Sequence, residues 1–415
     1  MSKRVSRRAL ISGAAGALGA AALAKLAGDA AAQGTPAVAP PVVPDDATKV
    51  QGHPTSALGA RSPFVRPERG PTGATVGNSN TPLQDLTGTI TPSDLHFERH
   101  HAGIPVIDPA RHRLVIHGLV ERPLELSLDE IKRFPQVTRT HFIECAGNGR
   151  SAFRNPKPEV TPQQVAGMIS NSEWTGVLLS TLFREVGARP EATWFLAEGG
   201  DACLMTRSVP ITKARDDAML AWAQNGEPLR PAQGYPMRLL LPGWEGNINV
   251  KWLRRLELGA APWMTRWETS KYTDPIRGNR ARIFSFENDA KSVITSPAYP
   301  GTIRARGWHA VSGLAWSGRG RITRVEVSTD GGRSWADTEL SGASLPKAAA
   351  RFETMWEWSG NEATLLSRAT DETGYVQPTR TALIEARGPG TDYHFNPIIG
   401  WKVAASGRVT FHGET

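Results

Sequence analysis

The 415-residue sequence predicts an α+β domain followed by an immunoglobulin-like β-sandwich. Over residues 91–285, helix and strand signals mix irregularly, without the βαβ alternation of a doubly wound sheet. Over residues 286–410, short runs that alternate with period two are separated by glycine-rich turns. Residues 33–90 are rich in Pro, Gly, Thr and Ala and predict a linker or extended arm.

The α+β domain should begin with a strand over residues 113–120, which is rich in apolar and β-branched residues. Ser127 and Glu130 have capping-box spacing, so we expect a short helix that ends at Phe134. The apolar, β-branched run over residues 137–143 predicts the next strand.

Two more helices and a hairpin should follow. Pro162 suits the first turn of a helix that opens at Thr161, and Ser180 should cap another over residues 181–186. Asn225-Gly226 is a two-residue hairpin signal. The runs after it predict strands over residues 237–243 and 249–253.

The β-sandwich is predicted from turns and alternation together. Val325 and Val327 are separated by one residue, as are Trp356 and Trp358, so each pair should face one side of a sheet. Turn-forming sequences punctuate the region at residues 317–320, 330–332 and 359–361. We find no catalytic cluster here, so packing or dimerisation is the expected role.

Charge and hydropathy exclude some functions. The formal net charge is +8, part of it in the first 32 residues, and no basic block is interleaved with aromatic residues. Nucleic acid is therefore not an expected partner. After the N-terminal region, no stretch is apolar and long enough to span a bilayer.

Residues 1–32 predict a twin-arginine export signal. Arg7 and Arg8 stand in Ser-Arg-Arg-Ala-Leu-Ile, an Ala/Gly-rich apolar core follows, and residues 30–32 are small enough for cleavage. A membrane anchor is the alternative, but the core over residues 9–24 is short and weakly apolar. We therefore expect a periplasmic protein that is exported after it has folded.

The sequence has only two cysteines, Cys145 and Cys203, which can pair in an oxidising compartment. Cys145, however, ends a predicted strand and precedes Ala-Gly-Asn-Gly, with Arg150 five residues on. A soft thiolate beside an arginine suits a metal with an anionic ligand, although a lone cysteine is more often a small buried hydrophobe. No Cys-x-x-Cys-His motif occurs, so we expect no c-type haem in this chain.

Together these segments resemble the sulfite oxidase family of molybdenum enzymes. The match runs in collinear order over about residues 90–410; each segment is weak alone, and a dozen in order is specific. The segments are Phe97–His101 with Ile104-Pro105, Cys145–Asn148, Trp174–Gly176, Gly200-Asp201, Ser208–Pro210, Asn225–Leu229, Gly234–Arg238, Leu241–Gly243, Val250–Trp252, Gly313–Gly318, Arg324–Gly332 with Trp335, and Gln377-Pro378.

The resemblance implies a molybdenum–molybdopterin cofactor, with Cys145 as the protein ligand of the metal, and a dimerisation role for the β-sandwich. A cofactor that ends in a phosphate requires buried cationic donors. For Arg238 and Lys251, an ordinary salt bridge is the alternative. By resemblance, the cofactor-binding residues are Phe97, Glu98, Arg99, His100, His101, Asp201, Arg238, Asn249, Val250 and Lys251.

Several positions depart from the sulfite oxidase pattern. Trp222 stands where those enzymes have a tyrosine beside the metal, and an indole only donates a proton whereas a phenol exchanges one. Ser312, Gln164 and Gln233 take the places of a basic residue, a tryptophan and a histidine. We therefore expect a pocket with less cationic charge and no titrating phenol. These departures, with residues 243–247, resemble the sulfane dehydrogenase branch of the family.

That branch implies oxidation of sulfane sulfur, displayed as a cysteine persulfide on a sulfur-carrier protein during thiosulfate oxidation. The reaction is oxygen-atom transfer, with Cys145 holding the metal, Trp222 beside it, and Arg99 and Arg150 stabilising developing oxyanions. Electrons should leave to a separate c-type cytochrome subunit. We expect a homodimer, or a heterotetramer with the cytochrome.

Three alternatives remain open. A sulfite dehydrogenase keeps the cofactor and changes the substrate. A periplasmic sulfoxide reductase runs the transfer backwards, but that branch generally lacks the C-terminal sandwich predicted here. An exported β-sandwich binding protein, with Cys145 merely buried, is the non-enzyme alternative, and molybdenum content distinguishes it.

Overall fold

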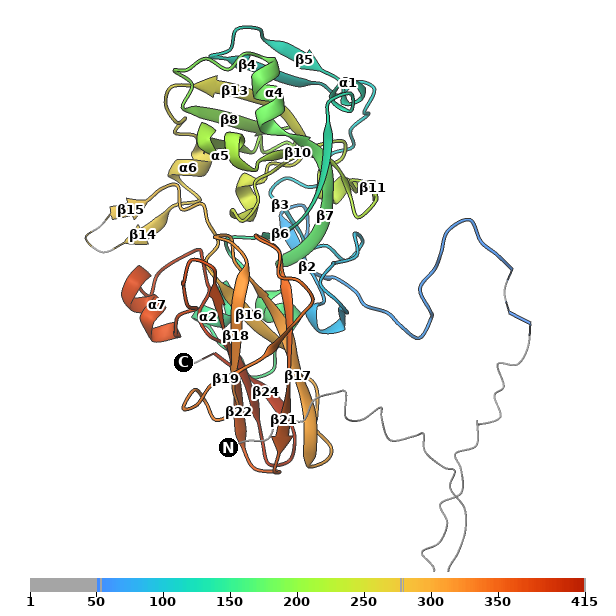
Figure 1. Ribbon diagram of the computed structural model, residues 1–415, viewed down its shortest axis with the longest axis vertical. Coiled ribbons are helices and arrows are strands. Elements are labelled where there is room, and N and C mark those ends of the chain that lie inside the picture. The colour runs from blue at the N-terminus through green and yellow to red at the C-terminus, as the bar shows by residue number, and fades with distance from the viewer. Residues whose placement is uncertain (1–50, 53, 277, 279, 414–415) are drawn as a thin grey trace, which may run out of the picture. The chain divides into compact units, whose positions relative to one another are not determined.

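The computed structural model describes residues 51–52, 54–276, 278 and 280–413 (Figure 1). The chain divides into two units, residues 1–60 and 61–415, and every element named below belongs to the second. The predicted export signal, residues 1–32, lies outside the described residues. Among the described residues, no helix has the length and apolarity needed to cross a membrane.

Two five-stranded sheets form the first domain. One sheet has the order β11 (Glu227–Pro228), β10 (Met219–Gln224), β7 (Ile169–Leu178), β6 (Gln136–Glu144), and β12 (Arg238–Leu240) also pairs with β10. The other has the order β5 (Leu124–Leu126), β4 (Leu114–Gly118), β13 (Leu253–Gly259), β8 (Trp194–Gly199), β9 (Thr206–Pro210). Only the β13–β4 pair is parallel within these two sheets, which confirms the α+β interpretation.

Short helices connect these strands. They are α1 (Leu128–Ile131), α2 (Arg150–Arg154), α3 (Pro162–Ala166), α4 (Leu179–Glu185), α5 (Ile211–Asp216) and α6 (Arg266–Thr269), with 3-10 turns η2 (Leu83–Asp85), η3 (Pro231–Gln233) and η4 (Gly246–Ile248). Both helix starts predicted at Ser127 and Thr161 carry a complete capping box. The cap predicted at Ser180 is wrong, because α4 begins at Leu179, two residues before the predicted start, and Leu178 is its N-cap.

Part of the segment predicted as a linker is packed structure. β1 (Gly70–Gly73) and β2 (Gly77–Asn80) form an antiparallel hairpin, and β2 pairs in turn with β3 (Glu98–His100). The hairpin is therefore packed on the α+β domain, which agrees with the predicted arm rather than with a free linker at residues 70–80. Its low periodicity reflects the four-residue strands, which are too short to show alternation.

Two antiparallel sheets form the second domain, as the sequence predicts. One has the order β16 (Lys291–Ser296), β17 (Gly307–Trp316), β21 (Ala350–Trp358), β20 (Glu339–Ser341); the other has the order β19 (Ala336–Asp337), β18 (Ile322–Ser328), β22 (Ala363–Asp371), β23 (Gly400–Val403), β24 (Val409–His412). β14 (Asp274–Ile276) pairs with β15 (Arg280–Arg282) before the sandwich, and α7 (Arg380–Arg387) lies beside it (Figure 1).

The hydrophobic cores show how the two domains join. Buried side chains between the two sandwich sheets, such as Trp316 and Trp401, form one cluster with Phe142 and Val165 of the first domain. A second cluster fills the space between the sheets and helices of the α+β domain. Because one apolar core crosses the boundary, the sandwich and the α+β domain are packed directly against each other.

One predicted strand is absent. Residues 249–252 form a loop with Trp252 at φ 54°, and β13 begins only at Leu253. This loop turns Asn249, Val250 and Lys251 toward the site described next. The Asn225-Gly226 hairpin is confirmed, with φ 50° and 78° at the two turn residues.

Candidate functional site

Cys145 lies at the end of β6, where the chain turns into α2. Its backbone N–H donates to Met168 O at 3.0 Å, and its own carbonyl accepts from Asn148 N at 2.8 Å. Gly149 has φ 96°, a conformation that favours glycine and closes the turn. Burial raises the pKa of the Cys145 thiol, while the Gly147 N–H and the charges of Arg99 and Arg150 oppose the shift.

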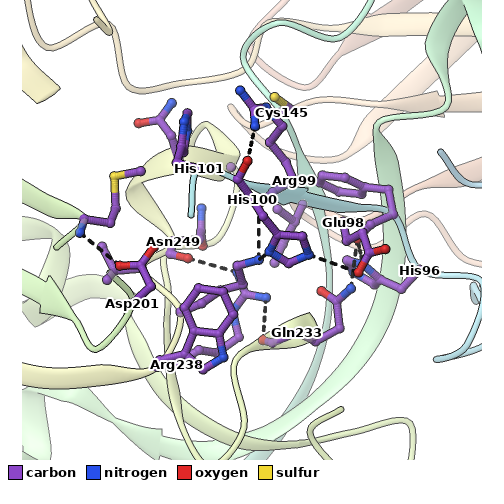
Figure 2. A pocket seen from close by; sticks show the side chains of 18 of the residues that line it. His96, Glu98, Arg99, His100, His101, Cys145, Asp201, Gln233, Arg238 and Asn249 are labelled. Carbon is purple, nitrogen blue, oxygen red and sulfur yellow. Dashed lines mark hydrogen bonds and ion pairs between the residues drawn. The ribbon is translucent and has the colours of Figure 1, made fainter. Parts of the chain in front are cut away.

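Two large pockets meet at Cys145, and a smaller one lies between it and Lys291 of the sandwich. The inner pocket has an empty volume of about 660 Å³, which includes space open to solvent, and it is lined by residues from β3, the loop before β13, η4 and the loop after β8. It contains every cofactor-binding residue predicted from the sequence: Phe97, Glu98, Arg99, His100, His101, Asp201, Arg238, Asn249, Val250 and Lys251. Figure 2 shows Cys145 at one end of this pocket and Arg238 toward the other.

Arg238 is a buried cation with no acid beside it. Its guanidinium donates to the carbonyls of Gln233 at 3.0 Å and Asn249 at 2.9 Å (Figure 2). It also stacks on the Trp174 ring at 5.2 Å. Burial lowers the pKa of Arg238 to about 9. A charge that is removed from water in this way is stable only with a compensating anion or many polar contacts.

Lys251 is the second buried cation of the inner pocket. Its Nζ contacts Arg99 O at 3.2 Å, Ala232 O at 3.0 Å and His100 Nδ1 at 2.9 Å. Burial first, and then the charge of Arg238, lower the pKa of Lys251 far below its usual value. In the described structure no carboxylate lies within ion-pair distance of either cation, so the salt-bridge alternative for Arg238 and Lys251 is not observed.

The strand β3 and the residue on each side of it place five consecutive predicted residues, 97–101, along the pocket. Glu98 pairs with Arg69 at 3.3 Å and with His100 Nε2 at 3.0 Å, and Arg99 donates to Gly77 O at 3.3 Å and to His100 O. Burial, with a smaller contribution from Arg99, lowers the pKa of His101 to about 4. His101 is therefore neutral near pH 7 in the protein without its ligand.

Tyr272 lines the site, although the sequence did not predict it there. Its hydroxyl lies 2.8 Å from His101 Nε2, it lines both large pockets, and it stacks under the Arg207 guanidinium at 5.0 Å. Burial, and then the charge of a Cys145 thiolate, raise the pKa of the Tyr272 phenol. The site thus contains a phenol, but its raised pKa keeps it protonated, so the expectation of a pocket without a titrating phenol is not contradicted.

Trp222, predicted to lie beside the metal, does not line either large pocket that contains Cys145. It is 8% exposed in β10 and belongs to the core of the α+β domain. Ser312 lies within β17, and Gln164 lies in α3 with its side chain completing the helix cap. Only Gln233, of the substituted positions, lines the inner pocket, where its amide donates to Phe97 O at 2.9 Å.

The outer pocket connects Cys145 with solvent, and its empty volume is about 1400 Å³ including open solvent. Its lining includes four basic side chains, Arg99, Arg150, Arg266 and Lys271, together with His101, and no carboxylate. The expectation that this pocket carries less cationic charge than in sulfite oxidases stays a prediction. Arg99 and Arg150 are the two that the family resemblance predicts, whereas Arg266 and Lys271 lie in a segment without a matching motif.

Asp201 is engaged with the second cysteine. Its Oδ2 accepts from Cys203 Sγ at 2.8 Å and its Oδ1 accepts from Met205 N at 3.2 Å. Burial and the neighbouring carboxylate raise the pKa of Cys203 to about 12. Both cysteines are free thiols, so the predicted alternative of a disulfide is not observed.

These residues fit a molybdopterin. The inner pocket offers two buried cations without acid partners, which suit a terminal phosphate, and a thiol at the far end, which suits a soft metal. His96 adds a buried ring whose Nε2 has no partner among the described residues. The donor set and the distribution of charge therefore match the two ends of such a cofactor.

Comparisons with known proteins agree. Residues 101–267 match the oxidoreductase molybdopterin binding domain, and residues 282–399 match the Mo-co oxidoreductase dimerisation domain. Mouse mitochondrial sulfite oxidase is 30% identical, with 80% of this chain and 63% of that protein covered. Chicken sulfite oxidase is 32% identical, with 71% and 69% covered. The chain thus spans just under two thirds of the mouse protein.

A solved structure is more similar still. The crystal structure of the sulfane dehydrogenase SoxCD from Paracoccus pantotrophus has a TM-score of 0.85 and 45% sequence identity, and the match covers 88% of this chain and 96% of that one. The matches to molybdenum enzymes also remove the non-enzyme alternative of a binding protein. The chain belongs to the sulfite oxidase family of molybdopterin oxidoreductases, and it resembles the sulfane dehydrogenases within it.

Proposed function

We propose that this chain oxidises sulfane sulfur that a carrier protein displays as a cysteine persulfide. One observation carries the proposal: the chain is 45% identical to a sulfane dehydrogenase over 88% of its length, against 30–32% identity to the sulfite oxidases over 71–80%. A difference of this size over the whole chain indicates a branch of the family rather than a few local substitutions.

The outer pocket suits a sulfur atom that is carried into the site on a peptide segment of another protein. It opens to solvent, it borders Cys145, and its lining carries four basic side chains and no acid. A persulfide sulfur on an extended peptide is anionic and reaches inward from a protein surface. The basic side chains would attract that anion and hold it beside the metal.

Each residue of the site has a definable part in this reaction. Bound molybdenum–molybdopterin supplies the transfer of an oxygen atom and accepts two electrons. Cys145 holds the metal, while Arg99 and Arg150 stabilise negative charge on the oxidised sulfur. His101 and Tyr272 form a hydrogen-bonded pair, 2.8 Å apart, that can hold a proton at the phenolic oxygen.

The partners follow from the same proposal. The sequence contains no Cys-x-x-Cys-His motif, so a separate c-type cytochrome subunit would accept the electrons. The match of residues 282–399 to a dimerisation domain supports a homodimer or a heterotetramer with that cytochrome. The twin-arginine sequence supports export of the folded protein to the periplasm.

Sulfite is the second candidate substrate, because a pocket lined by basic side chains also suits a small dianion. Purified holoenzyme should be supplied with persulfide-loaded carrier protein or with free sulfite, using a c-type cytochrome as acceptor. We expect a kcat/KM for the carrier at least about a hundredfold higher, which corresponds to roughly 2.7 kcal/mol of transition-state discrimination.

The matched control is the same carrier with its cysteine blocked by alkylation, which should give no turnover. Equal or higher kcat/KM with free sulfite would replace the proposal by a sulfite dehydrogenase. Turnover that persists in Cys145→Ser would show that the reduction of cytochrome does not pass through this site.

A further inference from the structure

The β-sandwich reaches into the site directly behind Cys145. Glu144, which precedes the cysteine, is 5% exposed, and its two carboxylate oxygens accept from different parts of the sandwich. Oε1 accepts from Lys291 Nζ of β16 at 2.9 Å, and Oε2 accepts from Trp316 Nε1 of β17 at 2.7 Å. The carboxylate is therefore fixed at both oxygens by the second domain.

Lys291 also contacts the cysteine turn itself. Its Nζ donates to Asn148 O at 3.1 Å, and the Asn148 side chain donates to Glu144 Oε1 at 2.9 Å. Asn148 then ties the turn to the α+β domain through Ala166 O at 2.9 Å and Met168 N at 3.1 Å. The four residues Glu144, Asn148, Lys291 and Trp316 are hereafter the Glu144 network.

The network is buried. Lys291 is 3% exposed, Asn148 2% and Trp316 0%, so these contacts lie away from bulk solvent. Removing one partner of a buried ion pair leaves an uncompensated charge, which is far more disruptive than the same loss at a surface. The position of the cysteine turn therefore depends on a cation that the other domain supplies.

The C-terminal segment of the sandwich holds the neighbouring side of the site. Arg150 donates from Nε and Nη2 to Asp392 O at 3.0 and 2.6 Å, and it stacks on Tyr393 at 5.2 Å. His394 N donates to Ala146 O at 2.8 Å. Both the cysteine turn and the arginine beside it are thus positioned from the second domain.

We propose that Lys291 is a positioning residue for the metal ligand, so that the β-sandwich, through the Glu144 network, sets the place of Cys145 and the redox potential of the bound molybdenum. A domain that matches dimerisation modules thereby acquires a second role in its own subunit. The physical basis is that groups behind a metal ligand orient it and tune the metal's electronics. The inference depends on the cofactor of the family and not on the identity of the substrate.

The charges of Glu144 and Lys291 determine the direction in which the midpoint potential should shift. Glu144 is next to Cys145 in sequence, and Lys291 neutralises it in a buried setting. Without Lys291, an unneutralised carboxylate would lie behind the thiolate and favour the more positive, oxidised metal. We therefore expect Lys291→Met to retain molybdenum, to shift the midpoint potential to a more negative value, and to lower kcat about tenfold or more with KM changed by less than about threefold.

Two variants separate this role from a purely structural one. Lys291→Arg should restore most of the potential and of kcat, because it returns the cation. The double variant Glu144→Gln/Lys291→Met should have a potential closer to wild type than Lys291→Met alone, because both charges are removed together. The potentials are measured by titration of purified holoenzyme, followed by electron paramagnetic resonance.

The control is Lys347→Met, which removes another contact between the domains. Lys347 Nζ binds Asp217 Oδ2 at 2.6 Å, and neither residue lines a pocket that contains Cys145. This variant should lose stability and keep the wild-type potential. A wild-type potential in Lys291→Met, or an equal shift in Lys347→Met, would overturn the proposal.

If Lys291→Met does not yield folded holoenzyme, Trp316→Phe tests the same claim with a smaller change. It removes the Nε1 contact to Glu144 and keeps an aromatic ring in the core. We expect molybdenum content to be retained and the potential to shift. An unchanged potential in this variant would also refute the assignment.

Discussion

At the scale of single residues, the site depends on which aromatic side chain faces Cys145. The sequence places Trp222 near a tyrosine position of the family, but the fold turns it into the core of the α+β domain. Tyr272 follows α6 in a loop with no local pattern, and it reaches the site only through tertiary packing. The resemblance therefore identified the residues of the cofactor pocket, but it did not identify Tyr272 as an aromatic residue of the site.

Tyr272→Phe tests the part of this phenol. The variant keeps the ring stacked under Arg207 and removes only the hydroxyl that contacts His101. We expect kcat to fall about tenfold or more with molybdenum content unchanged, because a positioned proton carrier is lost. Steady-state kinetics and metal analysis provide the measurement.

Trp222→Phe is the matched control, since it changes a buried aromatic residue that does not line either large pocket containing Cys145. It should lower stability and leave kcat close to wild type. The opposite pattern, with Tyr272→Phe active and Trp222→Phe inactive at full metal content, would contradict this description of the site.

At the scale of elements, the features that were predicted correctly are those that neighbouring residues determine. The capping boxes at Ser127 and Thr161 and the turn at Asn225-Gly226 are confirmed because each depends on neighbouring residues alone. The loop over residues 249–252 was predicted as a strand because its apolar residues resemble one. It is a loop in which Trp252 has φ 54°, and its Lys251 and Asn249 side chains donate to the carbonyls of Arg99 and Trp244.

Gly243 and Gly318 belong to two of the segments shared with the family, and close backbone packing explains why both positions are glycine. The two backbones touch across the domain boundary, and a Cβ added at Gly318 would lie 1.9 Å from Gly243 O. Gly318→Ala should therefore lower the free energy of unfolding by about 1–3 kcal/mol, as overpacking commonly does. Urea unfolding followed by tryptophan fluorescence measures the change.

Gly390→Ala is the control for this substitution, since no atom lies within 4 Å of its added Cβ. Its unfolding curve should coincide with that of the wild-type protein within error. A Gly318→Ala variant as stable as Gly390→Ala would mean that the domains do not approach as closely at this boundary as the structure has them.

At the scale of the whole molecule, the α+β domain and the sandwich are joined through one core and several buried polar contacts. Sequence periodicity predicted both domains but not the interface between them, because the interface contacts link residues more than a hundred positions apart. His141 lies at this boundary, with Nδ1 at 3.3 Å from Lys347 O. Burial lowers the pKa of His141 to about 4.

This shift predicts how stability depends on pH. The unfolded chain has a histidine pKa near 6.5, so between about pH 6.5 and pH 4 the unfolded state binds the proton and the folded state does not. Stability contributed by neutral His141 is complete above pH 6.5 and is lost as the pH falls toward 4. At pH 5 the loss is roughly 2 kcal/mol.

The His141→Asn variant should therefore lose about 2 kcal/mol less than wild type between pH 7 and pH 5. Urea unfolding of both proteins at the two pH values checks this difference. An identical loss in both proteins would show that His141 is already protonated in the folded state.

The central claim is that the Cys145 thiolate binds molybdenum in a pocket built by both domains. X-ray absorption at the molybdenum edge tests it most directly, by comparing purified wild-type protein with Cys145→Ser. We predict that the variant loses one sulfur ligand from the metal, together with its activity. An unchanged number of sulfur ligands in Cys145→Ser, or wild-type protein that contains no molybdenum, would contradict the account.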